Sequence, residues 1–354
     1  MEANPLSVSL EPSIRDKAKR VVDMIFAAAK GLTHSDAPPL ASRSFVNLRE
    51  LEQLCQEQPA SYVVEGLLPA DDVHVAVGDS GLGKTPWAYQ LGLCVATGQP
   101  FLGFPVQQGR VLYFDGENGL EQIKGISDSL CNYLRIEECP ENFLVRTDET
   151  GIANAAKRLK PSLVIVDTLR ALYPDAERSN DEMARLLNDL RLIARKERSA
   201  ILLLHHPRKP NAEKPVPPLE NLPPLEWLNE ASGARAFINQ TTTRIAFDRT
   251  KRNPDAAFVM KFHVKTKGPS ESIYIERVLD EDGGDLGYRR LIGVALLGND
   301  EQQAAFLKLP QQFTFKQAKH TYGRSDDPTR DWLLKCVGAG LVRQTGRGLY
   351  QKAA

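Results

Sequence analysis

Short apolar runs alternate with stretches of helical periodicity from Val63 to about Arg290. Three later runs between residues 241 and 277 alternate apolar and polar positions, which predicts antiparallel strands added toward one edge of a sheet. The pattern as a whole predicts an α/β fold, a mostly parallel sheet core flanked by helices. Four other runs are continuously apolar, as expected for strands buried on both faces: VHVAVG (73–78), RVLYFDG (110–116), SLVIVDT (162–168) and AILLLHH (200–206).

The chain on either side of these runs has a different character. Residues 12–30 carry apolar side chains at helical spacing, which predicts an amphipathic helix packed either on a neighbouring subunit or on the chain's own sheet. The proline-rich stretch that follows residue 206 predicts a long exposed loop before the run that begins at residue 241. We therefore divide the chain into an N-terminal helical segment and linker (1–60), an α/β core (61–298) and a C-terminal unit (299–354).

The C-terminal unit has its own pattern of three helices and a hairpin. Ser325 or Asp326 is the expected N-cap of the third helix, and Gly338 or Gly340 its expected end. Glycines within residues 345–348 predict the hairpin turn. Three helices followed by a hairpin is typical of a winged-helix domain.

Composition limits the partners and the compartment. Lys and Arg number 45, as do Asp and Glu, so attraction to nucleic acid has to come from local basic patches rather than from net charge. The five cysteines form no CxxC pair and no metal-ligand spacing, which is typical of thiols in a reducing compartment. The N-terminus does not have the pattern of a signal peptide, and no apolar run is long enough to span a membrane. We expect a soluble cytoplasmic protein.

Residues 78–85 match the phosphate-loop pattern G-x-x-x-x-G-K-[ST] at every fixed position. An apolar strand precedes the motif and a helical stretch follows it, which disfavours a chance glycine-rich turn. The motif predicts ATP held by backbone N–H groups and the helix N-terminus, with the lysine on the β- and γ-phosphates and the threonine hydroxyl on Mg²⁺. Proline at the next position falls in the first helical turn, where its missing N–H is tolerated. The residues are Gly78, Asp79, Ser80, Gly81, Leu82, Gly83, Lys84, Thr85 and Pro86.

Two acidic groups follow buried strands. Asp167 ends the run SLVIVD and is the expected Walker B acid, holding Mg²⁺ through water, although an acid at a strand end is also a common loop residue. Asp115 and Glu117 lie just past RVLYF, between the two Walker elements.

This D-x-E segment resembles the one that proteins of the RecA family carry at the end of the strand after the phosphate-loop helix. The resemblance implies that Glu117 is the general base that polarises the attacking water; the alternative is a solvated turn carboxylate. An AAA+ protein of the usual kind would place its glutamate directly after the Walker B aspartate. Thr168 occupies that position, which favours the RecA-like arrangement.

The two histidines at the end of AILLLHH resemble the polar sensor of RecA-like hexameric helicases. That sensor contacts the γ-phosphate and couples the nucleotide state to the next loop, and His205 aligns best with it. His205 and His206 also suggest a metal half-site, but adjacent strand residues point to opposite faces and no third ligand is at hand.

Further basic residues match the DNA-contacting and intersubunit elements of the same family. The loop after His206 is where RecA-like motors grip DNA, and a solvated surface loop is the alternative. The turn KTKGP resembles the basic finger that reaches the neighbouring subunit's nucleotide, although lysine stands where arginine is common. The loop candidates are Arg208, Lys209 and Lys214; the finger candidates are Lys265 and Lys267, with Arg235 and Arg249 as rivals.

Residues 300–354 carry nine Lys and Arg against five Asp and Glu, so this unit is basic. The side chains expected at DNA cluster around the turn between its second and third helices, where winged-helix domains meet duplex. Many such domains instead bind protein or pack on their host. The residues are Lys316, Lys319, Arg324 and Arg330.

In their order, the motifs of residues 61–290 most resemble the RepA-type, RecA-like ATPases of plasmids and phages, which include ring-shaped replicative helicases. The resemblance implies a Mg²⁺-dependent, hexameric ATPase that translocates on single-stranded DNA in its central channel, unwinds duplex and serves DNA replication. The alternative is a DNA-bound regulatory or recombination-mediator ATPase, in which ATP switches assembly without unwinding. A metabolic P-loop kinase is disfavoured, because no acceptor-site motif is evident and a basic C-terminal unit has no use there.

Overall fold

The computed structural model describes residues 47–57, 61–146, 151–173, 179–207, 217–219, 222–231, 235–249, 257–264, 271–281, 284–297 and 300–353. The amphipathic segment predicted at residues 12–30 lies outside these ranges.

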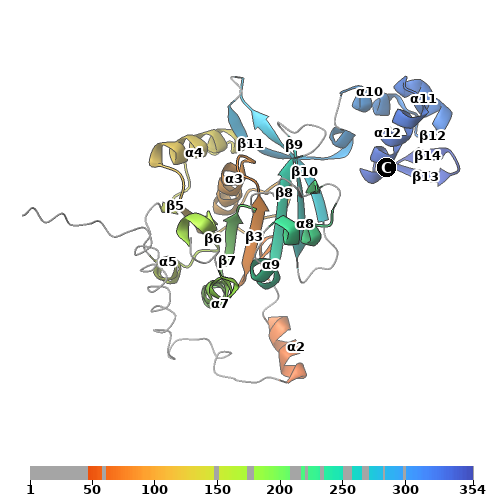
Figure 1. The fold of residues 1–354 in the computed structure, drawn as a ribbon. Helices are drawn as coiled ribbons and strands as arrows, with labels where there is room; N and C mark the ends of the chain where they lie inside the picture. Colours follow the sequence, from red (N-terminus) through yellow and green to blue (C-terminus); the bar gives the residue numbers. More distant parts are fainter. Residues whose placement is uncertain are drawn as a thin grey trace, which may run out of the picture.

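A large twisted sheet forms the centre of the molecule (Figure 1). Within the described ranges it has nine strands in the order β11-β10-β9-β8-β3-β7-β6-β4-β5. The six strands from β8 to β5 are parallel, and β9, β10 and β11 extend the sheet in antiparallel fashion. The strands are β3 (Val73–Gly78), β4 (Val111–Asp115), β5 (Phe143–Arg146), β6 (Leu163–Asp167), β7 (Ala200–His205), β8 (Thr243–Arg249), β9 (Ala257–Val264), β10 (Glu271–Leu279) and β11 (Asp285–Leu291).

Helices cover both faces of this sheet, because successive strand side chains point to opposite sides. In β3, Ala76 packs with α3 and α4, whereas Val75 and Val77 pack with the helices of the other face. Both layers are therefore apolar and closed to water. One face carries α3 (Lys84–Thr97) and α4 (Leu120–Leu134); the other carries α5 (Ile152–Leu159), α7 (Asn180–Glu197), α8 (Pro224–Ala231) and α9 (Arg235–Gln240).

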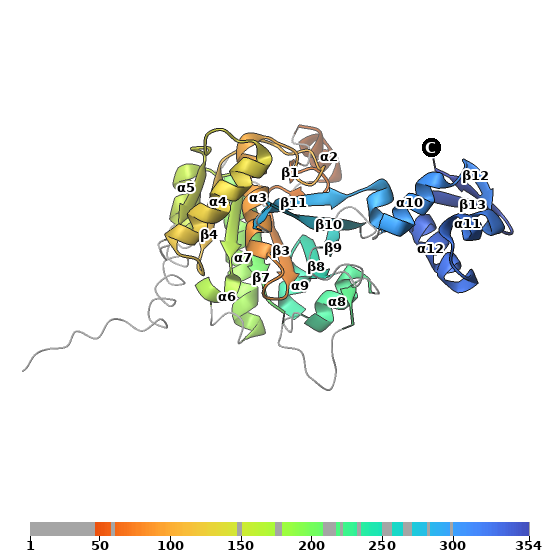
Figure 2. The ribbon, with the colours of Figure 1, turned by 90° about the horizontal axis from the view of Figure 1, so that it is seen from above.

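The C-terminal unit has a core of its own and lies beyond the β10–β11 end of the sheet in both views (Figures 1 and 2). Its three strands pair antiparallel in the order β12-β14-β13, and the side chains of Phe313 from β12 and Trp332 from α12 are buried in its core. A short 3₁₀ segment, η4 (Gly293–Leu297), leads into it. Its elements are α10 (Asp300–Lys308), β12 (Gln312–Thr314), α11 (Phe315–Tyr322), α12 (Asp326–Gly338), β13 (Val342–Gly346) and β14 (Leu349–Lys352).

Four shorter elements lie outside the main sheet and its covering helices. Helix α2 (Leu48–Glu57) comes before the hairpin of β1 (Tyr62–Val64) and β2 (Leu68–Pro69), and α6 (Leu169–Leu172) follows β6 directly. Among the helices of the described ranges, none is both long and apolar enough to cross a bilayer.

The predicted α/β fold, with a mainly parallel sheet flanked by helices, is confirmed. The four continuously apolar runs coincide with β3, β4, β6 and β7, which are buried throughout. The structure also differs from the expectation in three places. Strand β8 is parallel to β3, strands β5 and β11 were not anticipated, and part of the predicted loop forms α8 and α9. Those two helices form because Trp227, Leu228 and Phe237 bury their side chains in the core beside α7.

The buried His74 joins three parts of the core. Its Nε2–H donates to the carbonyl of Pro69 at 2.8 Å, and its Nδ1 accepts the N–H of Thr243 at 3.2 Å. Acceptance at Nδ1 requires the neutral ring, and burial lowers the pKa of His74 from 6.5 to about 4.

We predict that the free energy of unfolding falls as the pH is lowered from about 6.5 toward 4. In that window the unfolded histidine takes up a proton that the folded one excludes, a difference of about 3 kcal/mol at most. Denaturant unfolding at several pH values, on the wild type and on His74→Gln, measures this. The variant should lose the part of the slope that His74 supplies; equal slopes in both proteins contradict the prediction.

Candidate nucleotide-binding and hydrolysis site

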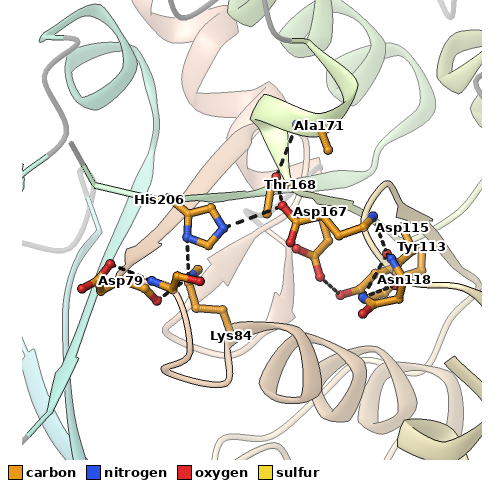
Figure 3. A network of polar contacts seen from close by, with 11 residues as sticks. Asp79, Lys84, Tyr113, Asp115, Asn118, Asp167, Thr168, Ala171 and His206 are labelled. Atoms are coloured by element: carbon orange, nitrogen blue, oxygen red, sulfur yellow. Dashed lines mark hydrogen bonds and ion pairs between the residues drawn. The ribbon is translucent and has the colours of Figure 1, made fainter. Parts of the chain in front are cut away.

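Four parallel strands end at the same edge of the sheet, and each delivers one part of the site. Strand β3 runs into the phosphate loop, β4 ends at Asp115, β6 ends at Asp167 and β7 ends at His205. Asp115 and Asp167 are register partners, so their carboxylates start from neighbouring positions. Figure 3 shows the polar contacts that result between these strand ends and Lys84.

The phosphate loop owes its shape to glycines. Gly81 and Gly83 have φ of 76° and 80°, in the left-handed region that other residues rarely occupy. A Cβ on Gly78 would lie 2.8 Å from the carbonyl oxygen of Phe247 in β8. Helix α3 begins at Lys84, so its N-terminal N–H groups and partial positive charge are directed at the loop. Pro86 lies in the first turn of that helix, as the sequence predicts.

The ammonium of Lys84 is held inside the loop. Its side chain is buried, and Nζ donates to the carbonyl of Asp79 at 2.8 Å and to Nδ1 of His206 at 3.2 Å. Burial lowers the pKa of Lys84 to about 8, while the carboxylates of Asp167, Asp79 and Glu117 oppose this shift. The lysine therefore carries its charge at the point where an anion would meet the start of α3.

The residues around Asp167 fit a magnesium ion. Oδ2 of Asp167 accepts the hydroxyl of Tyr113 at 2.7 Å, whereas the buried Oδ1 has no hydrogen-bond partner among the described residues. Burial raises the pKa of Asp167 to about 6, and the nearby hydroxyls of Tyr113 and Thr85 act in the opposite direction. A buried carboxylate oxygen without a partner, beside a threonine hydroxyl, offers the oxygen ligands that Mg²⁺ prefers.

Both carboxylate oxygens of Asp115 accept hydrogen bonds, and those from backbone N–H groups shape the turn that carries Glu117. Its Oδ1 accepts the N–H groups of Glu117 at 3.0 Å and Asn118 at 2.9 Å, and its Oδ2 accepts the hydroxyl of Tyr89 at 3.1 Å. The Asn118 side-chain amide adds two further contacts to the same carboxylate. Of the two carboxylates in the D-x-E segment, Glu117 is the one that reaches solvent, because its side chain is 45% exposed.

Glu117 is oriented by groups from two other strand ends. The hydroxyl of Thr168 donates to Oε1 of Glu117 at 2.8 Å, and Nε2 of His206 lies 3.8 Å from the same oxygen. Because Nδ1 of His206 faces the Lys84 ammonium, the ring proton is assigned to Nε2, toward Glu117. Burial and the charge of Lys84 lower the pKa of His206, which keeps the ring neutral.

The structure differs from the sequence prediction for the histidine pair. His205, the expected sensor, is buried and packs edge-on against Phe237, with ring centroids 4.8 Å apart. His206 is the histidine brought to Lys84 and Glu117. His205 is the last residue of β7 and His206 directly follows it, so the two consecutive side chains leave the chain in different directions and only His206 reaches the phosphate loop.

Of the core residues predicted to contact DNA or to form the intersubunit finger, two lie within the described ranges. Arg249 is exposed and ends β8, and Arg235 begins α9. The remaining candidates of the core, Arg208, Lys209, Lys214, Lys265 and Lys267, lie outside the described residues.

Three of the four basic side chains predicted to contact DNA in the C-terminal unit are paired with carboxylates. Lys319 lies 2.6 Å from Asp326. Arg324 makes a two-pronged contact with Glu301 at 2.7 and 2.9 Å. The third pair joins Arg330 to Asp327 at 3.2 Å. The fourth side chain, that of Lys316, is exposed. These pairs reduce the positive charge that the cluster presents to a partner.

Several residues of the site were not found from the sequence. Tyr89 and Tyr113 stack with ring centroids 4.0 Å apart and hold Asp115 and Asp167. From the sequence alone, a tyrosine that donates a hydrogen bond to a buried aspartate cannot be told from a tyrosine that only packs in the core. Asn118 and Thr168 directly follow the recognised acids, which is the one signal that could have indicated them.

Residues 37–212 match a protein family described as "AAA domain". A search of curated proteins gives no match. A solved structure titled "Crystal structure of the RadB recombinase" is similar at 17% identity and a TM-score of 0.44, over 64% of this chain and 93% of that chain. A similarity at this level carries no statement about function. Together with the phosphate loop and the α/β fold, the family match supports a P-loop nucleotide-binding domain.

We predict that His206→Ala lowers ATP hydrolysis by about 10²-fold, the typical loss on removing one oriented polar group from an active site. His205→Ala opens a gap beside Phe237 and should lower the melting temperature, while hydrolysis per folded molecule stays within about twofold. Phosphate-release assays on both variants, with circular dichroism to quantify folded protein, test the assignment. A larger catalytic loss in His205→Ala would contradict it.

Proposed function

We propose that the protein is a Mg²⁺-dependent, RecA-like ATPase that acts on DNA: a homo-oligomeric, hexameric motor that translocates on single strands and unwinds duplex. The observation that carries the proposal is the exposed Glu117 carboxylate, held by Thr168 and facing His206 beside the Lys84 ammonium. The groups that we propose for phosphate binding, for the metal and for the base all lie at one edge of the sheet. That is the set of groups that hydrolysis of a nucleoside triphosphate requires.

In the proposed mechanism the loop N–H groups and Lys84 bind the β- and γ-phosphates of ATP. Thr85 and Asp167 would hold Mg²⁺, which would supply positive charge to neutralise the phosphates. Glu117 accepts a proton from the attacking water, and Thr168 fixes the orientation of its carboxylate. His206, neutral and in contact with Lys84, senses whether the γ-phosphate is present.

The placement of the base supports the RecA-like subclass. Glu117 follows β4, and Asp167 is followed by a threonine rather than by a glutamate. The sensor leads directly into the segment with Arg208, Lys209 and Lys214, so a change at His206 would pass to the proposed DNA-gripping loop. Lys265, Lys267, Arg235 and Arg249 remain our candidates for the finger that completes the site of a neighbouring subunit.

We propose a winged-helix domain for residues 299–354 and a role of the whole protein in DNA replication in the cytoplasm. The element order of the unit supports this, since three helices are joined to an antiparallel sheet that ends in a hairpin. The alternative, a regulatory or recombination-mediator ATPase that finds a duplex site, depends on this unit as the DNA reader. The ion pairs of Lys319, Arg324 and Arg330 count against it.

We predict that Glu117→Gln lowers ATP hydrolysis by about 10²-fold or more while nucleotide binding persists, because the amide keeps the shape but cannot accept the proton. Steady-state phosphate release and nucleotide titration measure the two effects separately. The matched control is Glu121→Gln, in the exposed first turn of α4, which should behave as the wild type. Undiminished turnover in Glu117→Gln would remove the base assignment.

We predict that single-stranded DNA stimulates ATP hydrolysis more than duplex DNA does. We also predict that the active protein has the native mass of a hexameric ring. Backbone contacts by basic loops are independent of sequence and weaken with salt, so the stimulation should fall as salt is raised. Hydrolysis without DNA, with single strands and with duplex, together with a native mass measurement, checks this. Stimulation by duplex alone would favour the regulatory ATPase.

A further inference from the structure

The antiparallel pair β10–β11 touches the phosphate loop from the side. Nη2 of Arg277 donates to the carbonyl of Gly81 at 3.3 Å, and the hydroxyl of Tyr288 donates to the carbonyl of Gly83 at 2.9 Å. Arg277 and Tyr288 are register partners on the two strands, so they form one cross-strand pair. Each of the two left-handed glycines of the loop therefore has its carbonyl held by this pair.

Tyr288 is itself fixed by the helix that follows the loop. The side-chain amide of Gln90 in α3 bonds both to the carbonyl of Tyr288 at 2.8 Å and to its N–H at 2.7 Å. The ring is buried, and a Cβ on Gly83 would fall 1.9 Å from the Tyr288 hydroxyl. Loop, helix and strand are thus joined at one residue, and an Ala at position 83 would collide with it.

Holding these carbonyls has a direct consequence for the loop N–H groups. In a planar trans peptide the C=O and the following N–H point in opposite directions. Fixing the carbonyls of Gly81 and Gly83 outward, toward β10 and β11, turns the N–H groups of Leu82 and Lys84 away from those strands. Successive N–H groups turned to one side make the concave site that binds phosphate.

We propose that Arg277 and Tyr288 are positioning residues of the nucleotide site, which preset the phosphate-loop N–H groups for a polyphosphate. The inference rests on the proposed ATPase function and adds two residues that no motif of the chain contains. Because the preset groups meet the phosphate chain before and after hydrolysis, Arg277 and Tyr288 act on the binding of ADP and ATP alike. They leave the chemical step at Glu117 unchanged.

The test compares four variants of the full chain in the affinity for ADP and ATP and in KM and kcat. Tyr288→Phe removes the one hydroxyl; we expect Kd and KM to rise about 3- to 10-fold, as for one lost hydrogen bond, with kcat within about twofold. Arg277→Met should act in the same direction. Tyr133→Phe is the matched control, since the Tyr133 hydroxyl donates to the Tyr288 carbonyl at 3.3 Å; it should bind as the wild type.

The outcomes separate the inference from the function on which it rests. A wild type that binds no ATP would overturn the proposed ATPase. A wild type that binds ATP, with unchanged Kd in both Tyr288→Phe and Arg277→Met, would overturn the positioning role even if the melting temperature fell. A tenfold loss in kcat at unchanged KM would also overturn it. Rescue of affinity in Arg277→Lys, which keeps a donor, would support it.

Discussion

The parallel pairing of β3, β7, β6 and β4 is the constraint on which the candidate site depends. Parallel strands end at one edge of the sheet, so the residue that follows each strand arrives beside the others without any long-range contact of its own. The register partnership of Asp115 and Asp167 is a direct result. The apolar layers on both faces hold this pairing in place, and they are the reason why polar groups are confined to the strand ends.

Burial disfavours the charged forms of Lys84 and Asp167, and the opposite charges and hydrogen bonds around them partly offset this effect. Burial lowers the pKa of Lys84 to about 8 and raises that of Asp167 to about 6. The stacked pair Tyr89 and Tyr113 donates to the two aspartates and excludes water from beneath them. Charged groups that are partly stripped of water interact strongly with an arriving phosphate or cation, which is the physical basis for a nucleotide site here.

Much of this arrangement could be predicted from local patterns, and the remainder depends on packing across the chain. The phosphate loop, Asp115, Asp167 and four strands follow from apolar runs and the residues directly after them. Strand β11, helices α8 and α9 and the choice of His206 over His205 have no comparable local signal, since each is decided by what lies opposite in the fold. The same holds for two ion pairs of the C-terminal unit: Lys319 and Arg324 are evident as basic residues in the sequence, but their carboxylate partners, Asp326 and Glu301, come from α12 and α10.

The central claim is that the edge formed by β3, β4, β6 and β7 hydrolyses ATP with Glu117 as the base. A structure of the full chain with Mg²⁺, ADP and aluminium fluoride, a mimic of the transferred phosphoryl group, tests it most directly. We expect the fluoride complex between Lys84 and His206, a water between it and Glu117, and the cation on the Thr85 and Asp167 side. A nucleotide bound elsewhere, or Glu117 turned away from the fluoride complex, would show that Glu117 is not the base of this site.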